Sequence, residues 1–434
     1  MTIHIIHGDT PGALAELADE SIDSCVTDPP YGLGFMGKEW DTFKPGSHRE
    51  SKHFKVGRGD QRITSSNPNV NGRSHSPAMS PSQIEYDRSL SGQRGFQAWV
   101  ETWAREVLRV LKPGGHLLCS GAPRSYHRMA CGIEDAGFEV RDAVLWLFGQ
   151  GFPKSHNLKG EHEGWGTALK PAWEPILLAR KPFKGTVAEN VAVHGVGALN
   201  VDACRIGFQD DADREAAFPV GRLTSHGTGS LAGPGAAQEA ARTEFSAERN
   251  TKGRWPANVI HDGSDVAVAE FPETASVQPC GIKAGNNNNV YGQFAGGIPV
   301  TGIGDSGSAA RFFYCAKASR ADRNDGMSGF EKKPLLWSSG TQAPGTFQSP
   351  NTDRAARNNH PTVKPTDLMR YLCTLVTPPG GTVLDPFMGS GSTGRGALLG
   401  GFHFIGVERE AEYVAIADAR IRAISPLFTE VTLA

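Results

Sequence analysis

The sequence predicts an α/β fold whose sheet is assembled from both ends of the chain, with an insertion between them. At both ends, short apolar runs of strand length alternate with segments whose apolar residues recur at helical spacing. The middle, roughly 183–355, has little periodicity and many glycines. At 434 residues, the chain has room for two domains or for one large α/β domain with insertions.

The N-terminal part contains the first strands and helices of this fold. Lys-Pro-Gly-Gly at 112–115 is a helix stop, so a long helix is predicted from residue 96 to this point. The other elements expected here are strands at 2–6, 22–27, 116–121, 140–148 and 173–182, and helices at 13–18 and 124–137.

The C-terminal part returns to strict alternation of strands and helices. A glycine-rich loop, GSGSTG, lies between the first strand and the helix that follows it. The expected elements are a helix at 367–376, a strand end at 382–387, the loop at 389–394, a helix at 395–401, a strand at 403–408 and a helix at 411–424.

A basic segment follows the second strand. Residues 44–95 are rich in Ser, Gly, Pro and Asn and lack periodicity, which predicts a long mobile loop. Between Lys44 and Arg73, seven Lys or Arg residues stand against Glu50 and Asp60. The net charge of the whole chain is only −2, so an anionic partner would be met by a local patch of this kind.

Cysteine spacing and hydropathy exclude several classes of protein. The seven cysteines lie far apart and form no CxxC pair, which argues against a zinc knuckle, any other metal site of that kind and a disulfide framework. The N-terminus is too short and polar for a signal peptide, and no run of 18 apolar residues occurs. We therefore expect a soluble, intracellular protein, located in the cytoplasm.

The segment 382–408 has the form strand, glycine loop, helix, strand, acid. Gly389 and Gly391 would let the backbone pass close beneath a ligand, and Glu408 follows Asp385 at the spacing of a carboxylate that binds ribose hydroxyls. This pattern predicts a cofactor that contains adenosine. The lysine of a P-loop is missing, which disfavours ATP hydrolysis, whereas a dinucleotide oxidoreductase stays open from the topology.

Two motifs together resemble one enzyme family. DPPYG at 28–32 and DPFMGSGSTG at 385–394 are similar to the motifs of the DNA amino-methyltransferases, in the permuted, beta-type group where the target-amine motif precedes the cofactor motif. Gly8-Asp9, RVLKPGG at 109–115 and NHPTVKP at 359–365 match further motifs of that family at the expected places.

The resemblance covers about 1–182 and 355–425. It implies a Rossmann-like methyltransferase fold with a mixed seven-stranded sheet, and S-adenosyl-L-methionine as the cofactor. By residue, it implies contacts with the cofactor or its pocket from Asp9, Lys364, Pro365, Asp385, Pro386, Phe387, Gly389, Ser390, Gly391 and Glu408. The alternative for Asp9 is a plain turn residue, and for His360 and Lys364 it is the surface of a loop bounded by prolines.

The catalytic residues expected on this basis are Asp28, Pro29, Pro30 and Tyr31. An exocyclic amine is a poor nucleophile, because its lone pair is delocalised into the base. The Asp28 carboxylate and the Pro29 carbonyl can accept its two hydrogens and direct the lone pair, since two prolines fix the turn. Tyr31 can stack on a base that has left the duplex.

The expected division of the chain is a catalytic half at 1–182, a target-recognition region at 183–355 and a cofactor-binding half at 356–434. Double-stranded DNA is the expected partner, and a homodimer and a cognate restriction endonuclease are further partners to consider. The basic loop would contact DNA phosphates or simply be solvated. In the central region the candidate base contacts are Trp255, Asn258, Arg320 and Arg323.

Adenine N6 is favoured over cytosine N4, because the family's cytosine enzymes more often carry Ser than Asp at position 28. Further alternatives are an RNA or protein methyltransferase and a non-catalytic DNA-binding protein; the protein type usually has Asn there. Glu189-Asn190-Val191 and Pro279-Cys280 resemble motifs of cytosine C5-methyltransferases, but they occur in reverse order.

Overall fold

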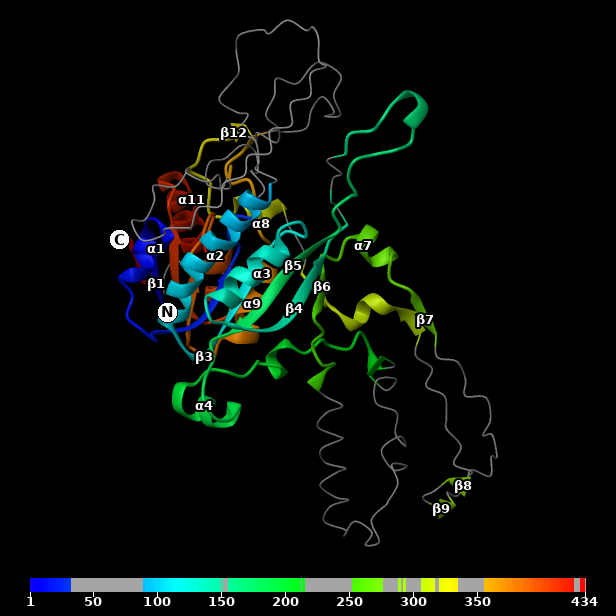
Figure 1. Cartoon of the computed structure of the whole chain (residues 1–434), viewed down its shortest axis with the longest axis horizontal. Helices are drawn as coiled ribbons and strands as arrows, with labels where there is room; N and C mark the ends of the chain where they lie inside the picture. The colour runs from blue at the N-terminus through cyan, green and yellow to red at the C-terminus, as the bar shows by residue number, and fades with distance from the viewer. Residues whose placement is uncertain are drawn as a thin grey trace, which may run out of the picture.

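Both ends of the chain contribute strands to one mixed sheet in the computed structural model (Figure 1). Among the described residues this sheet has ten strands, in the order β11-β6-β4-β5-β3-β2-β14-β15-β1-β16. Strand β5 is antiparallel to both neighbours, and the other pairs in this sheet are parallel. The strands are β1 (Thr2–His7), β2 (Ile22–Thr27), β3 (Leu111–Ser120), β4 (Glu139–Leu147), β5 (Trp173–Arg180), β6 (Val259–His261), β11 (Tyr314–Cys315), β14 (Thr382–Asp385), β15 (His403–Glu408) and β16 (Glu430–Leu433).

The structure describes part of the chain. The basic segment 44–73 and Cys280, both named in the sequence analysis, lie outside the described residues. Among the helices of the described residues, none combines the length and the apolar character that a membrane span requires. The described residues are 1–32, 89–149, 151, 155–211, 213–214, 252–275, 288–289, 292–293, 306–316, 320–334, 355–424 and 430–433.

The predicted α/β class and the mixed sheet built from both chain ends are confirmed. The N-terminal strands β1 and β2 enclose the C-terminal strands β14 and β15 in the order β2-β14-β15-β1. The sheet is wider than the seven strands expected, because β6 and β11 extend one edge and β16 the other. These strands have two to four residues, which is too short for a periodic pattern to reveal them.

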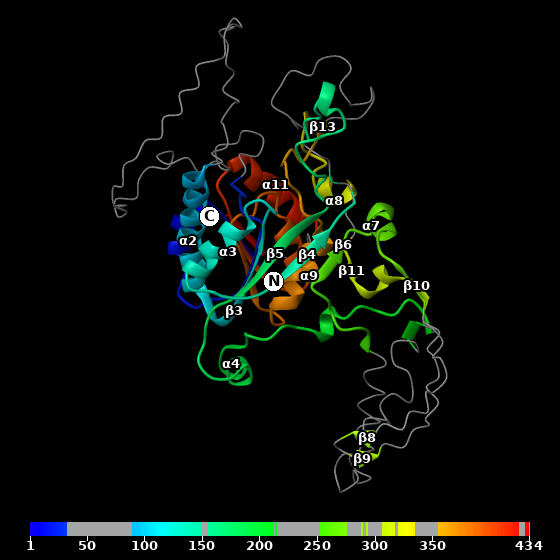
Figure 2. The ribbon, with the colours of Figure 1, turned by 45° about the vertical axis from the view of Figure 1, so that its right-hand side comes forward.

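Helices cover both faces of the sheet. Helices α1 (Thr10–Ala15), α2 (Leu90–Val110) and α3 (Tyr126–Asp135) pack on one face. Helices α9 (Thr366–Val376), α10 (Ser392–Leu399) and α11 (Ala411–Arg422) pack on the other. Figures 1 and 2 show α2 and α3 on the opposite side of the sheet from α9 and α11.

Alternation along the strands divides the core between these two layers. Leu117 and Leu177 face the α1–α3 layer, whereas Leu118 and Leu178 face the α9–α11 layer. Central strands buried on both faces read as continuous apolar runs, which is why the sequence pattern predicted a strand at each of β3 and β5, although with other bounds.

Several element boundaries differ from the prediction, and three of them lie in predicted loops or turns. Helix α2 begins at Leu90, within the loop predicted for 44–95, because Ser89 caps it by accepting the Gly92 N–H at 3.1 Å. Helix α10 begins at Ser392, within the predicted glycine loop. Strand β3 begins at Leu111, so the Lys-Pro-Gly-Gly segment continues into a strand.

Parts of the central region 183–355 join the main sheet. Strand β6 pairs with β4, and β11 pairs with β6. Cys204 lies in the same hydrophobic core as α9. Smaller elements of this region are α4 (Val187–His194), α7 (Asp265–Ala269), α8 (Arg320–Asn324), and the strands β7 (Glu273–Ala275), β8 (Asn288–Asn289), β9 (Gly292–Gln293), β10 (Ser306–Ser308), β12 (Lys333–Pro334) and β13 (Ala355–Ala356), the last of which ends at the region's boundary.

Close packing of α3 on α2 at a glycine can be tested. A Cβ at Gly132 would lie 2.6 Å from the Gln97 carbonyl oxygen and 2.8 Å from the Val100 Cβ. We expect Gly132→Ala to lower the free energy of unfolding by about 1–3 kcal/mol in urea denaturation. Gly12→Ala in α1, where a Cβ meets nothing within 4 Å, is the matched control and should be neutral or stabilising. Equal effects of the two substitutions would contradict this account.

Candidate active site

Four parallel strands end at one edge of the sheet, and the predicted site residues follow these ends. Asp28 and its neighbours come after β2, Asp385 ends β14, Glu408 ends β15, and Asp9 comes two residues after β1. Because β2, β14, β15 and β1 are adjacent and parallel, their carboxyl ends lie side by side. The structure therefore brings together the two motifs that lie at opposite ends of the sequence.

Direct hydrogen bonds join the two chain ends at this edge. The Thr27 hydroxyl donates to the Asp385 Oδ1 at 2.7 Å, across 358 positions of sequence. The Thr10 hydroxyl donates to the Pro386 carbonyl oxygen at 2.6 Å. The Gly8 N–H donates to the Glu408 carbonyl oxygen at 3.0 Å. The DPPY and DPF segments are thus held in one framework.

A buried lysine connects the acid and the tyrosine of the DPPY segment. The Lys364 Nζ donates to the Asp28 Oδ2 at 2.7 Å and to the Tyr31 hydroxyl oxygen at 3.0 Å. The Tyr31 hydroxyl in turn donates to the Asp28 Oδ1 at 2.5 Å. Lys364 is 8% exposed, so the alternative of a surface loop residue is wrong for this side chain.

Glu174, at the start of β5, is a member of this site that sequence reasoning missed. Its Oε2 lies 3.2 Å from the Lys364 Nζ. An acid at the start of a predicted strand did not indicate a site residue, because the sequence does not give the strand's position in the sheet. The strand order places β5 two strands away from β2, with only β3 between them.

Burial and charge set the protonation states of this cluster. Burial lowers the pKa of Lys364, but the Asp28 and Glu174 carboxylates raise it by more, and the resulting pKa lies well above the ordinary value. Burial, together with the charge of Asp28, raises the pKa of the Tyr31 hydroxyl well above its ordinary value. At neutral pH, Lys364 is therefore a cation and Tyr31 a neutral donor.

The glycine loop after β14 has the backbone geometry that a close ligand approach requires. Gly389 and Gly391 have φ angles of +54° and +79°, in the left-handed region that favours glycine. A Cβ at Gly389 would lie 2.8 Å from the His360 Nε2. The Glu408 carboxylate accepts the N–H groups of Gly389 at 2.9 Å and Glu410 at 2.8 Å, so the predicted ribose-binding acid lies directly against this loop.

Arg420 of α11 braces the glycine loop, and sequence reasoning also missed it. Its side chain is fully buried, and its Nη1 donates to the Ser390 carbonyl oxygen at 2.5 Å and to the Ser390 hydroxyl oxygen at 3.0 Å. Burial, together with the nearby Arg395, lowers the pKa of Arg420 to about 10. An arginine in an amphipathic helix is usually at the surface, so the pattern gave no indication of this role.

Asp385 is a buried acid with several hydrogen-bond donors. Burial raises its pKa to about 6, although hydrogen bonds from Thr393, Thr27 and the Phe387 N–H oppose this shift. The Phe387 N–H donates to Asp385 at 3.0 Å. Asp385 can therefore change its charge near neutral pH.

The other predicted cofactor residues line the same edge or support it. The Phe387 ring packs against the rings of Trp99 and Trp103, with centroid distances of 5.5 and 5.3 Å. Pro365 is buried, and its carbonyl oxygen accepts the Met369 N–H in the first turn of α9. Asp9 is exposed before α1, and its side chain makes no capping hydrogen bond.

The candidate base contacts of the central region whose side chains are described have different partners. Trp255 is exposed, and the Arg205 guanidinium lies 5.2 Å from the centroid of its ring. Asn258 donates to the Asp142 carboxylate at 3.3 Å. Arg323 instead donates to the carbonyl oxygens of Asn358 at 3.2 Å and His360 at 2.6 Å, so it positions the NHPTVKP segment. The side chain of Arg320 lies outside the described residues.

The segment that resembles a cytosine C5-methyltransferase motif has a structural role. Glu189 and Thr186 form a capping box at the start of α4. Asn190 is buried and donates to the carbonyl oxygens of Pro113 at 2.9 Å and Val196 at 2.7 Å. These contacts account for both polar residues without any ligand.

Comparison with known proteins identifies related sequences. A family model described as DNA methylase, N6_N4_Mtase, matches residues 22–419. The type II methyltransferase M.HindIII of Haemophilus influenzae is 27% identical over 211 residues, which are 45% of this chain and 64% of that protein. M.HinfI of the same species is 39% identical over 74 residues, 17% of this chain and 21% of that protein. The chain thus spans just under two thirds of the first relative and about a fifth of the second.

Several solved structures are similar over nearly the whole chain. One is TTHA0409 of Thermus thermophilus, described as a DNA modification methylase and complexed with S-adenosyl-L-methionine, at 14% identity and a TM-score of 0.37, covering 99% of both chains. Another is the cytosine-N4-specific PvuII DNA methyltransferase, at 13% identity and a TM-score of 0.41, covering 98% of this chain and 94% of that one. Both TM-scores are below 0.5.

The raised pKa of Asp385 predicts a pH-dependent stability. Because the folded protein holds this proton up to pH of about 6 while the unfolded chain releases it near 3.8, stability falls as pH rises between these values. Asp385→Asn keeps an acceptor for Thr27 and Phe387 but cannot ionise. We therefore expect the difference in free energy of unfolding, variant minus unmodified protein, to increase by about 3 kcal/mol as the pH rises across this interval. Urea denaturation at a series of pH values tests this, and a constant difference would contradict it.

Proposed function

We propose, from the premise that this chain belongs to the N6_N4_Mtase family of DNA methylases, that it transfers a methyl group to an exocyclic amine of DNA, adenine N6 in particular. The predicted cofactor, S-adenosyl-L-methionine, agrees with this membership. We further assign the chain to the permuted, beta-type group, because DPPY at 28–31 precedes DPF at 385–387.

The observation that carries this proposal is the direct contact between the target-amine motif and the cofactor motif. Thr27 precedes Asp28 and donates to Asp385 at 2.7 Å, so the two acids lie at neighbouring strand ends. A methyl transfer needs donor and acceptor in line at short range, and one rigid framework for both supplies that geometry. The sheet provides this framework through parallel pairing of β2 with β14.

The residues at this edge fit the predicted cofactor. The Glu408 carboxylate, which already accepts backbone N–H groups of the loop, is suited to ribose hydroxyls, and the Asp385 carboxylate is suited to an ammonium group. The left-handed glycines let the backbone pass close to a ligand. When bound, the cofactor supplies an electrophilic methyl group on a sulfonium.

The DPPY segment would orient the amine. The Asp28 carboxylate and the Pro29 carbonyl accept its two hydrogens, which frees the nitrogen lone pair for attack. Tyr31 holds Asp28 through its hydroxyl and offers its ring to the base. Asp rather than Ser at position 28 supports adenine, so cytosine N4 is the alternative that a base analysis decides.

The regions of the chain are assigned in the same way. We propose that 1–182 holds the catalytic half, 183–355 contains the target-recognition region and 356–434 holds the cofactor-binding half. Double-stranded DNA is the proposed partner, with phosphate contacts from the basic segment 44–73. The proposed enzyme is prokaryotic or phage-encoded and acts in the cytoplasm. A restriction endonuclease of the same specificity would be its natural counterpart.

The function is tested by methylome sequencing of DNA from a methylation-free host that expresses the protein. We expect N6-methyladenine in a defined sequence motif, identified by mass spectrometry, and none with Asp28→Ala, because the amine loses its acceptor. Asp19→Ala, at an exposed position before β2 and so at the opposite end of that strand from Asp28, is the control and should keep the modification. N4-methylcytosine would overturn the assignment of the base, and unmodified DNA would contradict the proposed function.

The cofactor site is tested by calorimetric titration with S-adenosyl-L-methionine. A charged hydrogen bond contributes about 1.5–3 kcal/mol, so we expect Glu408→Gln to weaken binding by about 10- to 100-fold. Glu410→Gln, whose carboxylate pairs with the exposed Arg409 at 3.0 Å, is the matched control and should bind nearly as well as the unmodified protein. Similar affinities for both variants would remove Glu408 from the site.

A further inference from the structure

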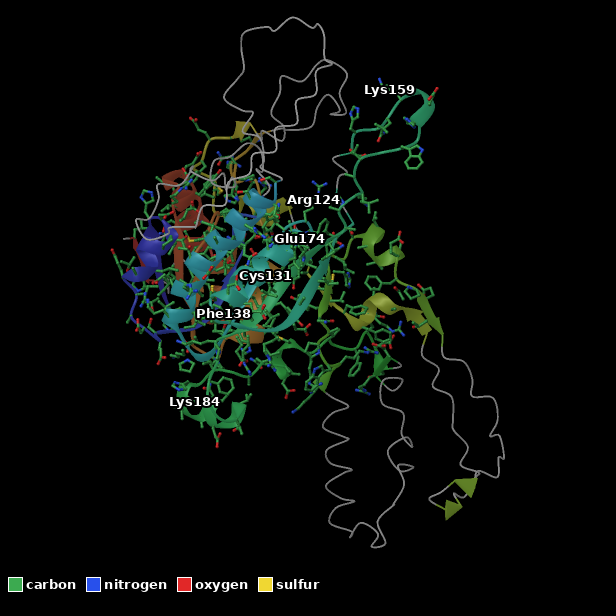
Figure 3. All side chains as sticks on the ribbon, in the orientation of Figure 1. Arg124, Cys131, Phe138, Lys159, Glu174 and Lys184 are labelled. Carbon is green, nitrogen blue, oxygen red and sulfur yellow. The ribbon has the colours of Figure 1, made fainter. Side chains whose placement is uncertain are left out.

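Glu174 has no role in the function proposed above, yet its carboxylate lies inside the site. It follows Trp173 at the start of β5, at the same end of the sheet as Arg124 after β3 (Figure 3). Its side chain is 24% exposed, and its Oε2 lies 3.2 Å from the Lys364 Nζ. Among the described residues that oxygen accepts no hydrogen bond, and its polar contact is the ion pair with Lys364.

The fold explains why this acid meets the lysine. Glu174 alternates in register with Ile176 and Leu178, which face the layer of α9. Lys364 lies two residues before α9 begins, so it enters the same layer. A residue one position away on β5 would face the opposite layer, as Leu177 does.

The charges of the cluster give Glu174 a distinct effect. Asp28 and Lys364 alone form a neutral ion pair 2.7 Å apart. Addition of the Glu174 carboxylate makes the three charges sum to −1. A second carboxylate on the lysine also competes with Asp28 for the ammonium, which leaves more of the Asp28 charge directed toward the amine.

We propose that Glu174 is a positioning residue for methyl transfer, which holds the Lys364 ammonium and offsets its charge so that Asp28 acts as an anionic acceptor for the amine. The inference rests on the proposed function. The reaction forms a bond between the amine nitrogen and the methyl carbon and breaks the carbon–sulfur bond, whose electron pair goes to sulfur. The nitrogen becomes positive until it loses a proton to Asp28, and a cluster of net negative charge stabilises that positive charge.

The titration of Glu174 gives a readout that a purely structural role would not change. The titratable groups that face it are Lys364, Asp28 and Tyr31. Burial raises the pKa of Glu174, Lys364 opposes this shift and Asp28 adds to it. Because the ionised form is required, kcat should fall as the pH falls through this raised pKa. Asp385 also titrates, but its protonation should act on cofactor binding.

The experiment compares Glu174→Gln and Glu174→Asp with the unmodified full-length protein. We expect Glu174→Gln to lower kcat by about 10- to 100-fold and to abolish the decrease of kcat at acidic pH. Its affinity for the cofactor and its KM for DNA should change little. Glu174→Asp keeps the charge, so it should recover part of kcat and again show a kcat that decreases at acidic pH. Glu139→Gln, at the opposite end of the β4–β5 pair, is the matched control and should leave kcat unchanged.

The outcomes separate this inference from the proposed function. An unmodified protein that methylates DNA, together with a Glu174→Gln variant of equal kcat and pH profile, overturns the role of Glu174 alone. An unmodified protein that binds the cofactor but methylates nothing overturns the proposed function and the inference with it. If thermal denaturation shows that Glu174→Gln is not folded, Glu174→Asp is the deciding variant. A kcat of Glu174→Asp that does not decrease at acidic pH also overturns the role.

Discussion

The parallel pairing of β2 with β14 is the interaction on which the rest of the site depends. Ser24 and Cys25 pair in register with Val383 and Leu384, across most of the length of the chain. Without this pairing, the strand ends that lead to Asp28 and Asp385 would not lie side by side. The hydrogen bond from Thr27 to Asp385 follows from it, and the parallel pairing of β1 with β15 likewise accompanies the bond from Thr10 to Pro386.

The site concentrates buried charge, which folding alone would disfavour. Burial of an ion costs several kcal/mol, and partners offset this cost only when the geometry is good. Lys364 meets that condition with two carboxylates and a hydroxyl, and Arg420 meets it with oxygens of Ser390. Such groups are weak contributors to stability, so their presence at one edge of the sheet points to chemistry there.

Most of the framework could be predicted from the sequence, because it depends on periodicity and turn chemistry. β2 and β15 were predicted with the bounds that the structure has, since apolar runs flanked by turn residues define them. The start of α2 was missed because Ser89 acts as a cap in a segment that otherwise reads as a loop. The strands β6, β11 and β16 were missed because they are too short to show a pattern.

The site was predicted where it lies in motifs and missed where it depends on tertiary placement. Asp28 follows a strand, and Asp385 and Glu408 each end one, in recognisable segments. Glu174 and Arg420 have no local signature, and only the strand order and the helix packing bring them to the site. Proximity between residues that are far apart in the sequence is encoded in the whole fold rather than in any one segment.

The division of the site between the two chain ends has a consequence for protein synthesis. A ribosome must translate the chain through β14, as far as Asp385, before this strand can complete the sheet beside β2. Until then β2 keeps an unpaired edge, which nascent chains must protect from aggregation. A product that terminates before residue 385 would carry Asp28 and Tyr31 but neither Asp385 nor Glu408. Such a truncated polypeptide therefore has only one half of the candidate site.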